Sequence, residues 1–238
     1  MNNKKTVYII PVGGLGNRMR FVNSACSVLF SENPKQNIRV INFVTNMFPD
    51  DIGKFLFFDS RVKVVNIRFR SEKLLLIFLR FLMYFSHFLT FGYFAKYGAK
   101  KIDKKNKIIS SFNRIDKGCI SFFPLRCAMV KQKNYNAVHI RRGDNKRAIA
   151  KNDLDKYFNF IELSEYPVYL ASDDEKLKRT IVKKFPKKVQ VREVDLDRGD
   201  KYSLQEAFLE MTECINADLF LGSDGSSFSA IINAYRSL

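Results

Sequence analysis

The chain is built from short apolar runs, each followed by a loop and then by a helical pattern. In the first half, the apolar run 7–12 precedes the glycine-rich segment 13–17, and apolar residues then recur three and four positions apart over 19–29. A second apolar run covers 38–44, and 62–67 is a candidate third strand. Because helices return the chain from the end of one strand to the start of the next, this order favours a parallel sheet. The sequence therefore predicts an α/β fold.

The second half repeats this order of elements. The predicted strands are 137–140, 168–171, 189–194 and 218–221. The predicted helices are 175–184, capped by the segment 172–174, then a helix from Ser203 to about residue 215, and a last helix over 228–235. No repeat of fixed period is present, which excludes solenoids and propellers. We therefore expect two α/β domains, 1–132 and 133–238.

The charge balance is strongly basic, with 41 Lys and Arg against 24 Asp and Glu and a net charge of +17. Such a balance favours anionic partners such as nucleic acid, a membrane surface or a phosphorylated small molecule. It is equally typical of a solvated lysine-rich surface. Nucleic acid is not expected, because the chain has no zinc-ligand spacing, no helix-turn-helix pattern and no aromatic-flanked RNA motif.

The cysteines and the N-terminus indicate the compartment. The four cysteines form no Cys-x-x-Cys pair, and the chain has two histidines, so a zinc site is not expected. These cysteines are Cys26, Cys119, Cys127 and Cys214. No pattern of a signal peptide is present near Met1, so we expect a reducing, cytoplasmic setting.

The segment 74–94 is unusually apolar for this chain. A membrane span is disfavoured by Arg80, because a charge near the middle of a span costs about 3 kcal/mol. Two interpretations stay open. The segment is either a helix packed in the first domain, or an amphipathic segment at the inner membrane face with the lysines of 96–107 beside anionic lipid.

The strongest local motif is the segment 139–144, His-Ile-Arg-Arg-Gly-Asp, which directly follows a predicted strand. Parallel sheets bind ligands at the carboxyl ends of their strands. Neighbouring residues of an extended chain point to opposite sides, so one of Arg141 and Arg142 can reach a ligand while the other pairs elsewhere. An arginine fork grips phosphate through two hydrogen bonds. The alternative is a surface loop with an Arg–Asp ion pair.

Two further loops join a strand to a helix in the same manner. The segment 13–17 is neither a dinucleotide fingerprint nor a P-loop, and 222–229 is not a serine-hydrolase elbow. Each allows backbone N–H groups at a helix start to approach an anion, although each is also an ordinary strand-to-helix turn. Together with 139–144, these loops predict a phosphorylated ligand in a cleft between two domains.

The order of the segments 13–17, 139–144, 169–174 and 222–229 resembles the fucosyltransferases, namely the α-1,2 enzymes and their α-1,6 and protein O-fucosyltransferase relatives. The resemblance implies a GT-B-like fold with two Rossmann-like domains facing a cleft. It also implies transfer of L-fucose from GDP-fucose to a hydroxyl of a glycan acceptor, with inversion and without a metal or other cofactor. The motif 139–144 favours the α-1,2 type, and the implied partners are the nucleotide-sugar donor and the glycan.

The resemblance also implies roles for single residues. Arg141 would grip the donor diphosphate, and Asn17 would orient sugar or acceptor hydroxyls, which makes these two the catalytic candidates. The implied donor-binding residues are Gly14, Gly16, His139, Arg141, Asp173, Ser226, Ser227 and Phe228. The nearest candidates for a base are Asp144 and Asp153.

The chain departs from the family pattern in two respects. Arg18 stands where the family usually has glutamine, and the second domain is expected to be shortened at its C-terminus. Two alternative functions are therefore kept, a GT-B-like glycosyltransferase that uses another nucleotide sugar and a catalytically inactive GDP-sugar-binding relative.

Overall fold

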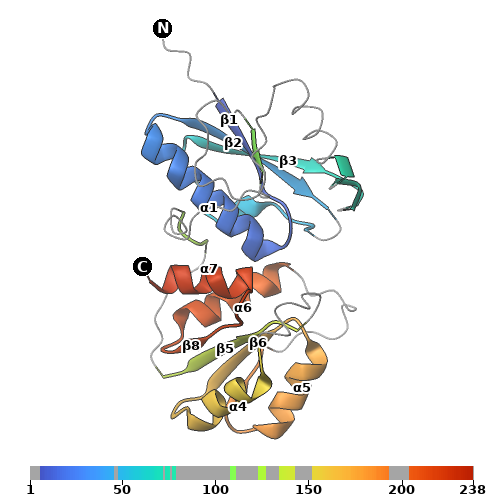
Figure 1. Cartoon of the computed structure of the whole chain (residues 1–238), viewed down its shortest axis with the longest axis vertical. Helices are drawn as coiled ribbons and strands as arrows, with labels where there is room; N and C mark the ends of the chain where they lie inside the picture. Colours follow the sequence, from blue (N-terminus) through green and yellow to red (C-terminus); the bar gives the residue numbers. More distant parts are fainter. Residues whose placement is uncertain are drawn as a thin grey trace. The chain divides into compact units, whose positions relative to one another are not determined.

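Parallel strands joined through helices form both halves of the chain, as the computed structural model shows (Figure 1). The chain divides into two compact units, Met1–Arg126 and Cys127–Leu238, which are considered separately below. The structure describes residues 6–45, 48–71, 73–75, 77–78, 108–110, 123–126, 134–142, 152–192 and 204–237.

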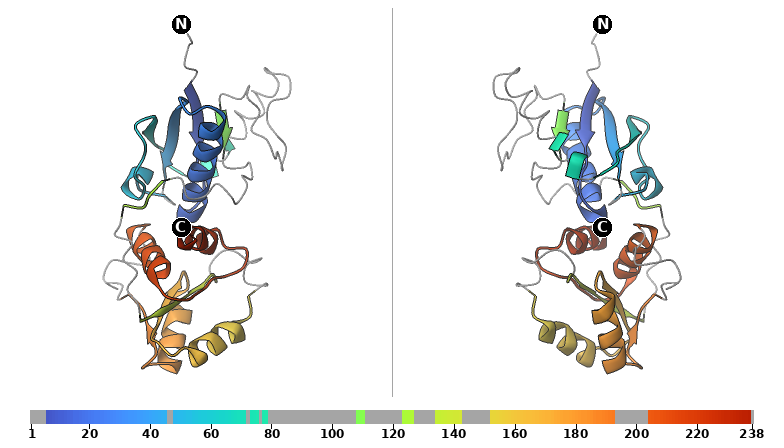
Figure 2. Two further views of the ribbon diagram at one scale, coloured as in Figure 1. Left: turned by 90° about the vertical axis from the view of Figure 1, so that its left-hand side faces the viewer. Right: turned by 90° about the vertical axis from the view of Figure 1, so that its right-hand side faces the viewer.

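The N-terminal unit contains a parallel sheet whose strands lie in the order β3-β2-β1-β4. These strands are β1 (Thr6–Ile10), β2 (Asn37–Val44), β3 (Val62–Arg68) and β4 (Ile108–Ser110). Helix α1 (Leu15–Glu32) connects β1 to β2 and lies along the sheet, and the short helix η1 (Ile52–Lys54) follows β2 (Figure 2). The predicted strands of this half are confirmed, while β4 was not anticipated.

Alternation along the strands explains how this sheet packs. Ile9, Ile38 and Val40 are fully or almost fully buried. Helix α1 ends where the N–H of Asn33 donates to the carbonyl of Leu29, and Pro34 cannot continue it. The helix begins earlier than expected, since residues 15 to 17, predicted to lie in a loop, form part of its first turn.

The C-terminal unit repeats the topology, with strands in the order β7-β6-β5-β8 and every pair parallel. Its strands are β5 (Asn136–Ile140), β6 (Val168–Ser172), β7 (Val189–Gln190) and β8 (Phe220–Leu221). Its helices are α4 (Leu154–Leu163), α5 (Glu175–Lys184), α6 (Leu204–Asn216) and α7 (Ser227–Arg236). The strand order reverses direction between β5 and β8, which is where open α/β sheets bind ligands.

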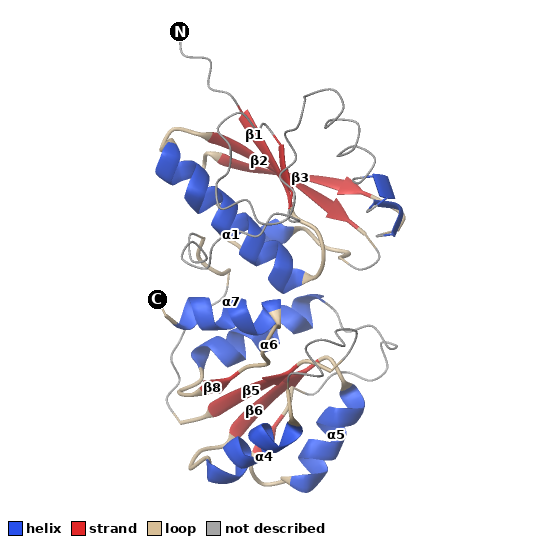
Figure 3. Cartoon of the chain, in the orientation of Figure 1, coloured by secondary structure: helices blue, strands red, loops and turns tan. Residues whose placement is uncertain are grey.

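Helices cover both faces of this second sheet (Figure 3). On one face, Val138 and Leu170 pack with Tyr157 and Ile161 of α4 and with Ile181 of α5. Helices α6 and α7 lie on the other face and bury their apolar sides there. The carboxyl ends of the strands are therefore held by a core on either side.

The structure differs from the sequence analysis of this half in three elements. The strand predicted over 218–221 is limited to Phe220–Leu221. Helix α4 was not predicted, although Asp153 caps it and its apolar residues recur at helical spacing. The strand predicted over 189–194 is described only as Val189–Gln190, with residues 191 and 192 outside it.

Several sequence expectations concern residues outside the described part of the chain. Among them are Asp144, Ser203, the lysines of 96–107 and most of the apolar segment 74–94. Across the ranges that the structure does describe, no helix is long and apolar enough to cross a membrane.

Candidate donor-binding site

The candidate site lies where β5 and β8 end side by side in the C-terminal unit. Strand β5 continues into Arg141 and Arg142, and β8 continues into the loop 222–226 that leads to α7. The carboxyl ends of these neighbouring strands therefore bring together two of the three predicted motifs, the described part of 139–144 and the loop 222–229.

Ser223 joins the ends of the two strands. Its hydroxyl accepts the N–H of Arg141 at 2.9 Å and donates to the carbonyl of His139 at 3.0 Å. It also lies 2.8 Å from the hydroxyl of Tyr157. With 3% exposure, Ser223 is a buried polar tie across the switch point. The sequence motif contained Ser223, but no role was predicted for it.

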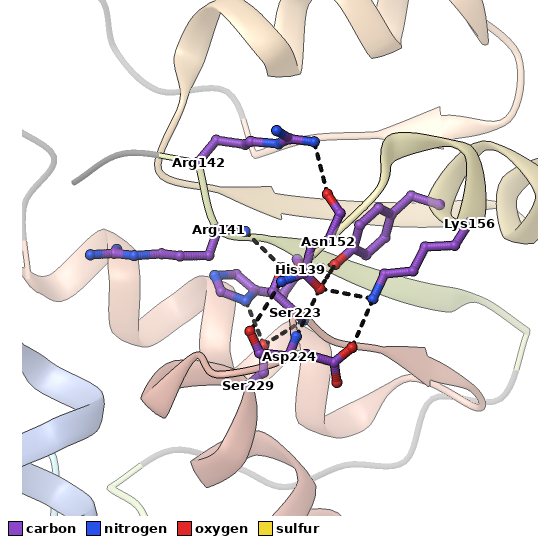
Figure 4. Close-up of polar contacts among 9 residues, drawn as sticks. His139, Arg141, Arg142, Asn152, Lys156, Ser223, Asp224 and Ser229 are labelled. Carbon is purple, nitrogen blue, oxygen red and sulfur yellow. Dashed lines mark hydrogen bonds and ion pairs between the residues drawn. The ribbon is translucent and has the colours of Figure 1, made fainter. Parts of the chain in front are cut away.

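Gly222 is required by the close approach of α7 to the strand. A β-carbon at this position would lie 2.7 Å from Cβ of Ser229 and 2.9 Å from Cε1 of Phe220. The close approach lets the Ser223 N–H donate to the Ser229 hydroxyl at 2.9 Å. The same hydroxyl lies 2.7 Å from Nδ1 of His139 (Figure 4).

His139 is a buried, neutral imidazole. Burial is the main cause that lowers its pKa to about 3, and the positive charges of Arg141 and Lys178 lower it further. Its ring also lies against Phe228, with 4.7 Å between ring centroids. A group with such a low pKa is a weak base near neutral pH, so His139 is suited to hydrogen bonding and packing rather than to proton abstraction.

The two arginines point in different directions (Figure 4). Nη1 of Arg141 forms an ion pair with Asp173 at 2.7 Å, and 30% of its side chain is exposed. Nη2 of Arg142 donates instead to the carbonyl of Asn152 at 3.0 Å, and its backbone N–H donates to Asp173 at 2.8 Å. Arg141 is thus the arginine with a held but accessible guanidinium.

Asp173 and Asp174 are neighbours but contact different groups. The segment 172–174 was predicted to cap α5, and Asp174 does so by accepting the N–H of Leu177 at 3.0 Å. Asp173 instead binds both neighbouring arginines as described above. Its predicted contribution to a guanosine pocket stays a prediction.

Helix α7 presents free N–H groups at its start. Ser226 caps the helix by accepting the N–H of Ser229 at 3.4 Å, and it is buried. The N–H groups of Ser227 and Phe228 have no acceptor among the described residues. Partial positive charge at such a helix start favours an anion. The predicted loop residues Ser226, Ser227 and Phe228 therefore divide into one cap and two potential donors.

Residues that the sequence did not reveal hold this loop in place. The side-chain amide of Asn152 donates to the carbonyl of Asp224 at 3.0 Å and accepts its N–H at 2.8 Å. Its oxygen also accepts from Tyr157 at 3.0 Å and from Lys156 at 2.8 Å. Lys156 pairs with Asp224 as well, at 3.2 Å. No short motif signals these contacts, because the partners are far apart in the sequence.

The predicted residues of the N-terminal loop lie in the other unit. Gly13 has a φ of +86°, and Gly14 is an exposed N-cap with open space around it. Gly16 is buried, whereas Asn17 is exposed on the first turn of α1.

Arg18 has a structural place in that unit. Its buried guanidinium donates to the carbonyls of Gly13 and Phe43 and to Oδ1 of Asn42, and it lies 4.0 Å from the centroid of the Phe48 ring. Arg18, which differs from the glutamine of the fucosyltransferase pattern, therefore connects the glycine loop to the end of β2.

The described residues identify neither a catalytic base nor a metal site. Asp153 is the N-cap of α4 and accepts the N–H of Asp155 at 3.2 Å, while Asp144 is not described. Within the described ranges, no cluster of three His, Cys, Asp or Glu side chains could hold a metal ion. The expected independence from metal stays a prediction.

Comparisons with known proteins identify the fold. No protein-family model matches the sequence, and no curated protein matches it. A structure of the α-1,6-fucosyltransferase NodZ soaked with GDP-fucose is similar with a TM-score of 0.58 and 12% identity, covering 97% of this chain and 93% of that chain. NodZ co-crystallised with GDP gives a TM-score of 0.57 and 13% identity, covering 96% and 92%.

A third structure, NodZ from Bradyrhizobium, gives a TM-score of 0.56 and 11% identity, covering 96% of this chain and 93% of that chain. At identities of 11–13%, these similarities show a shared fold and carry no conclusion about function. The chain has the α/β fold with two parallel sheets that is found in GT-B glycosyltransferases, as the sequence predicted.

Proposed function

We propose that the protein is an inverting glycosyltransferase that transfers L-fucose from GDP-fucose to a hydroxyl of a glycan acceptor, with an α-1,2 linkage. The observation that carries the proposal is that two groups lie at the carboxyl ends of β5 and β8: the partly exposed Arg141, and the start of α7, whose first N–H groups have no acceptor among the described residues. The likeness in fold to the α-1,6-fucosyltransferase NodZ, whose crystal was soaked with GDP-fucose, supports this choice of donor.

The chemistry requires stabilisation of the leaving diphosphate. Negative charge grows on the β-phosphate as the bond to the sugar breaks, and preorganised positive groups stabilise this charge. Arg141, held by Asp173, supplies a guanidinium fork, and the start of α7 supplies aligned N–H groups. These groups provide charge stabilisation without a metal ion, which is why we propose a metal-independent reaction.

The acceptor side of the reaction is proposed on sequence grounds. Asn17 is exposed on α1 and has a carboxamide that can orient a sugar hydroxyl. The acceptor hydroxyl attacks the anomeric carbon from the face opposite the diphosphate, which inverts the configuration. Its proton passes to a weak base such as Asp144 or to water.

Donor binding and turnover test this function together. Isothermal titration with GDP, GDP-fucose, GDP-mannose, UDP-glucose and ADP would identify the nucleotide, and release of GDP from GDP-fucose would show turnover. We expect GDP and GDP-fucose to bind most tightly, and turnover to persist in excess EDTA.

Each other outcome has a defined meaning. Preferred binding of UDP or ADP would replace the proposal with another nucleotide-sugar transferase. Tight binding of GDP without turnover on any acceptor of a glycan panel would indicate an inactive GDP-sugar-binding relative. Linkage analysis of the product decides between α-1,2 and other linkages.

A further inference from the structure

Asn152 connects the two loops that carry the proposed diphosphate-binding groups. It lies just before α4, at the far end of the connection from β5 to α4, and is 1% exposed. Its side chain contacts the loop after β8, whereas its backbone carbonyl contacts the loop after β5.

On the β8 side, Asn152 fixes a single residue through two bonds. Its amide nitrogen donates to the carbonyl of Asp224 at 3.0 Å, and its oxygen accepts the N–H of Asp224 at 2.8 Å. The carboxamide thereby pairs with the backbone as a neighbouring strand would. Asp224 stands two residues before the cap Ser226, so this pairing sets where α7 begins.

On the β5 side, the carbonyl of Asn152 accepts Nη2 of Arg142 at 3.0 Å. This bond holds the Arg142 side chain away from Arg141 (Figure 4). The backbone N–H of Arg142 is bound to Asp173, which also holds the Arg141 guanidinium. Asn152 is therefore linked to the proposed phosphate-binding arginine through Arg142 and Asp173.

Supporting bonds keep the carboxamide itself in one orientation. Its oxygen accepts the hydroxyl of Tyr157 at 3.0 Å and Nζ of Lys156 at 2.8 Å. Donors on this atom from three different residues leave the amide nitrogen facing the carbonyl of Asp224. Moving this buried carboxamide would break several hydrogen bonds and leave buried polar atoms without partners, which is energetically costly.

We propose that Asn152 is a positioning residue for the diphosphate of the donor. It does not touch the donor, and instead holds the start of α7 and Arg142 in the arrangement that presents N–H groups and Arg141 to phosphate. This inference rests on the proposed function, since it assumes a nucleoside diphosphate at this sheet edge.

The test compares a ligand that has phosphates with one that lacks them. Affinities of GDP and guanosine are measured by titration for the wild type, Asn152→Asp and Asn152→Ala. Asn152→Asp keeps the size and the accepting oxygen but cannot donate to the Asp224 carbonyl. We expect GDP affinity to fall about tenfold in both variants, the equivalent of one lost hydrogen bond or more, while guanosine affinity changes less than about twofold.

A matched control is available at the opposite end of the same sheet. Asn136 is also buried, and its carboxamide bonds Ser164 at 2.7 Å and the N–H of Leu219 at 3.1 Å. Asn136→Asp should lower stability without changing the ratio of GDP to guanosine affinity. If Asn152→Ala does not fold, Tyr157→Phe removes one bond to the Asn152 oxygen together with the contact to the Ser223 hydroxyl, with little change in shape, and it should weaken GDP binding about threefold.

The outcomes separate the two proposals. A wild type that does not bind GDP contradicts the proposed function. A wild type that binds GDP, with an unchanged GDP-to-guanosine ratio in the Asn152 and Tyr157 variants, overturns the positioning role. Equal losses for GDP and guanosine would also overturn it, because a general loss of structure weakens both.

Discussion

At the scale of single residues, Arg141 carries the greatest expected effect on activity. Arg141→Ala removes the accessible guanidinium, and we expect kcat/KM for GDP-fucose to fall by about 100-fold or more. Arg141→Lys should rescue poorly, because lysine lacks the fork. Arg142→Ala should cost less, because Arg142 donates to the protein at Asn152. Initial rates of GDP release measure all three variants.

The chain contains a matched control for this experiment. Arg61 forms an ion pair with Asp59 at 2.7 Å in the N-terminal unit, with a third of each side chain exposed. Arg61→Ala should therefore leave kcat/KM unchanged within about twofold, as exposed ion pairs contribute little. Wild-type kcat/KM in Arg141→Ala would remove Arg141 from the proposed mechanism.

His139 predicts a pH dependence of stability. Its pKa is about 3 in the folded protein against 6.5 for an unperturbed histidine, so between these pH values the unfolded chain binds more protons. The free energy of unfolding should therefore fall as the pH drops from 6.5 toward 3, by up to about 5 kcal/mol. Urea denaturation across this range measures it, and His139→Gln should show a flatter profile.

A direct titration checks the same prediction. The chain has two histidines, so in His87→Gln the imidazole signals in an NMR titration belong to His139 alone. These signals should not shift between pH 8 and pH 5. A midpoint near 6.5 would contradict the buried, neutral state.

At the scale of elements, the junction of β8 with α7 depends on Gly222. Gly222→Ala would force its Cβ against Ser229 and the Phe220 ring, and we expect a loss of roughly 1–3 kcal/mol in the free energy of unfolding. Gly14→Ser is the comparison, because open space surrounds Gly14 and serine can cap α1. It should change stability by less than about 0.5 kcal/mol. Equal effects of the two substitutions in urea denaturation would refute this account.

Elements with local signals were predictable, whereas contacts between distant elements were not. Helix α5 has the predicted bounds because Asp174 caps it and Lys183 and Lys184 close it. Helix α4 carried comparable signals and was overlooked. The bonds between Asn152 and Asp224 join positions 72 residues apart, and no local pattern specifies such a pair. The alternation of side chains along an extended chain predicted that Arg141 and Arg142 point to opposite sides. The residues that they contact, Asp173 and Asn152, could be identified only from the folded structure.

At the scale of the whole molecule, both units use the same strand order but place different chemistry at the switch point. In the C-terminal unit, Arg141 directly follows β5, and the loop after β8 contains serines and leads to the start of α7. In the N-terminal unit, the loop after β1 is glycine-rich and tied down by Arg18. The excess of basic residues suits an anionic donor but exceeds what one diphosphate needs.

Part of that excess lies beside exposed apolar side chains in the N-terminal unit. Strand β3 ends the sheet, and Ile67, Ile77 and Phe78 are 40%, 62% and 43% exposed. The exposed basic residues close to them in the sequence are Lys63, Arg68, Arg70 and Lys73. Leu75 from the same segment is buried against Val12 and Phe43, so its start packs on the sheet with one side only.

We propose that these exposed apolar side chains, Ile67, Ile77 and Phe78, and the basic residues close to them in the sequence contact anionic membranes. Apolar side chains enter the lipid interface, and each nearby Lys or Arg adds about 1 kcal/mol on an anionic surface. We expect flotation with phosphatidylglycerol vesicles at low salt, and release as salt screens the attraction.

Ile77→Glu should abolish this flotation. Leu163→Glu is its matched control, because Leu163 is 83% exposed in the other unit and should not matter. If the wild type ignores anionic vesicles at low salt, Ile67, Ile77 and Phe78 do not contact anionic membranes, and the interpretation of segment 74–94 as a packed helix is favoured.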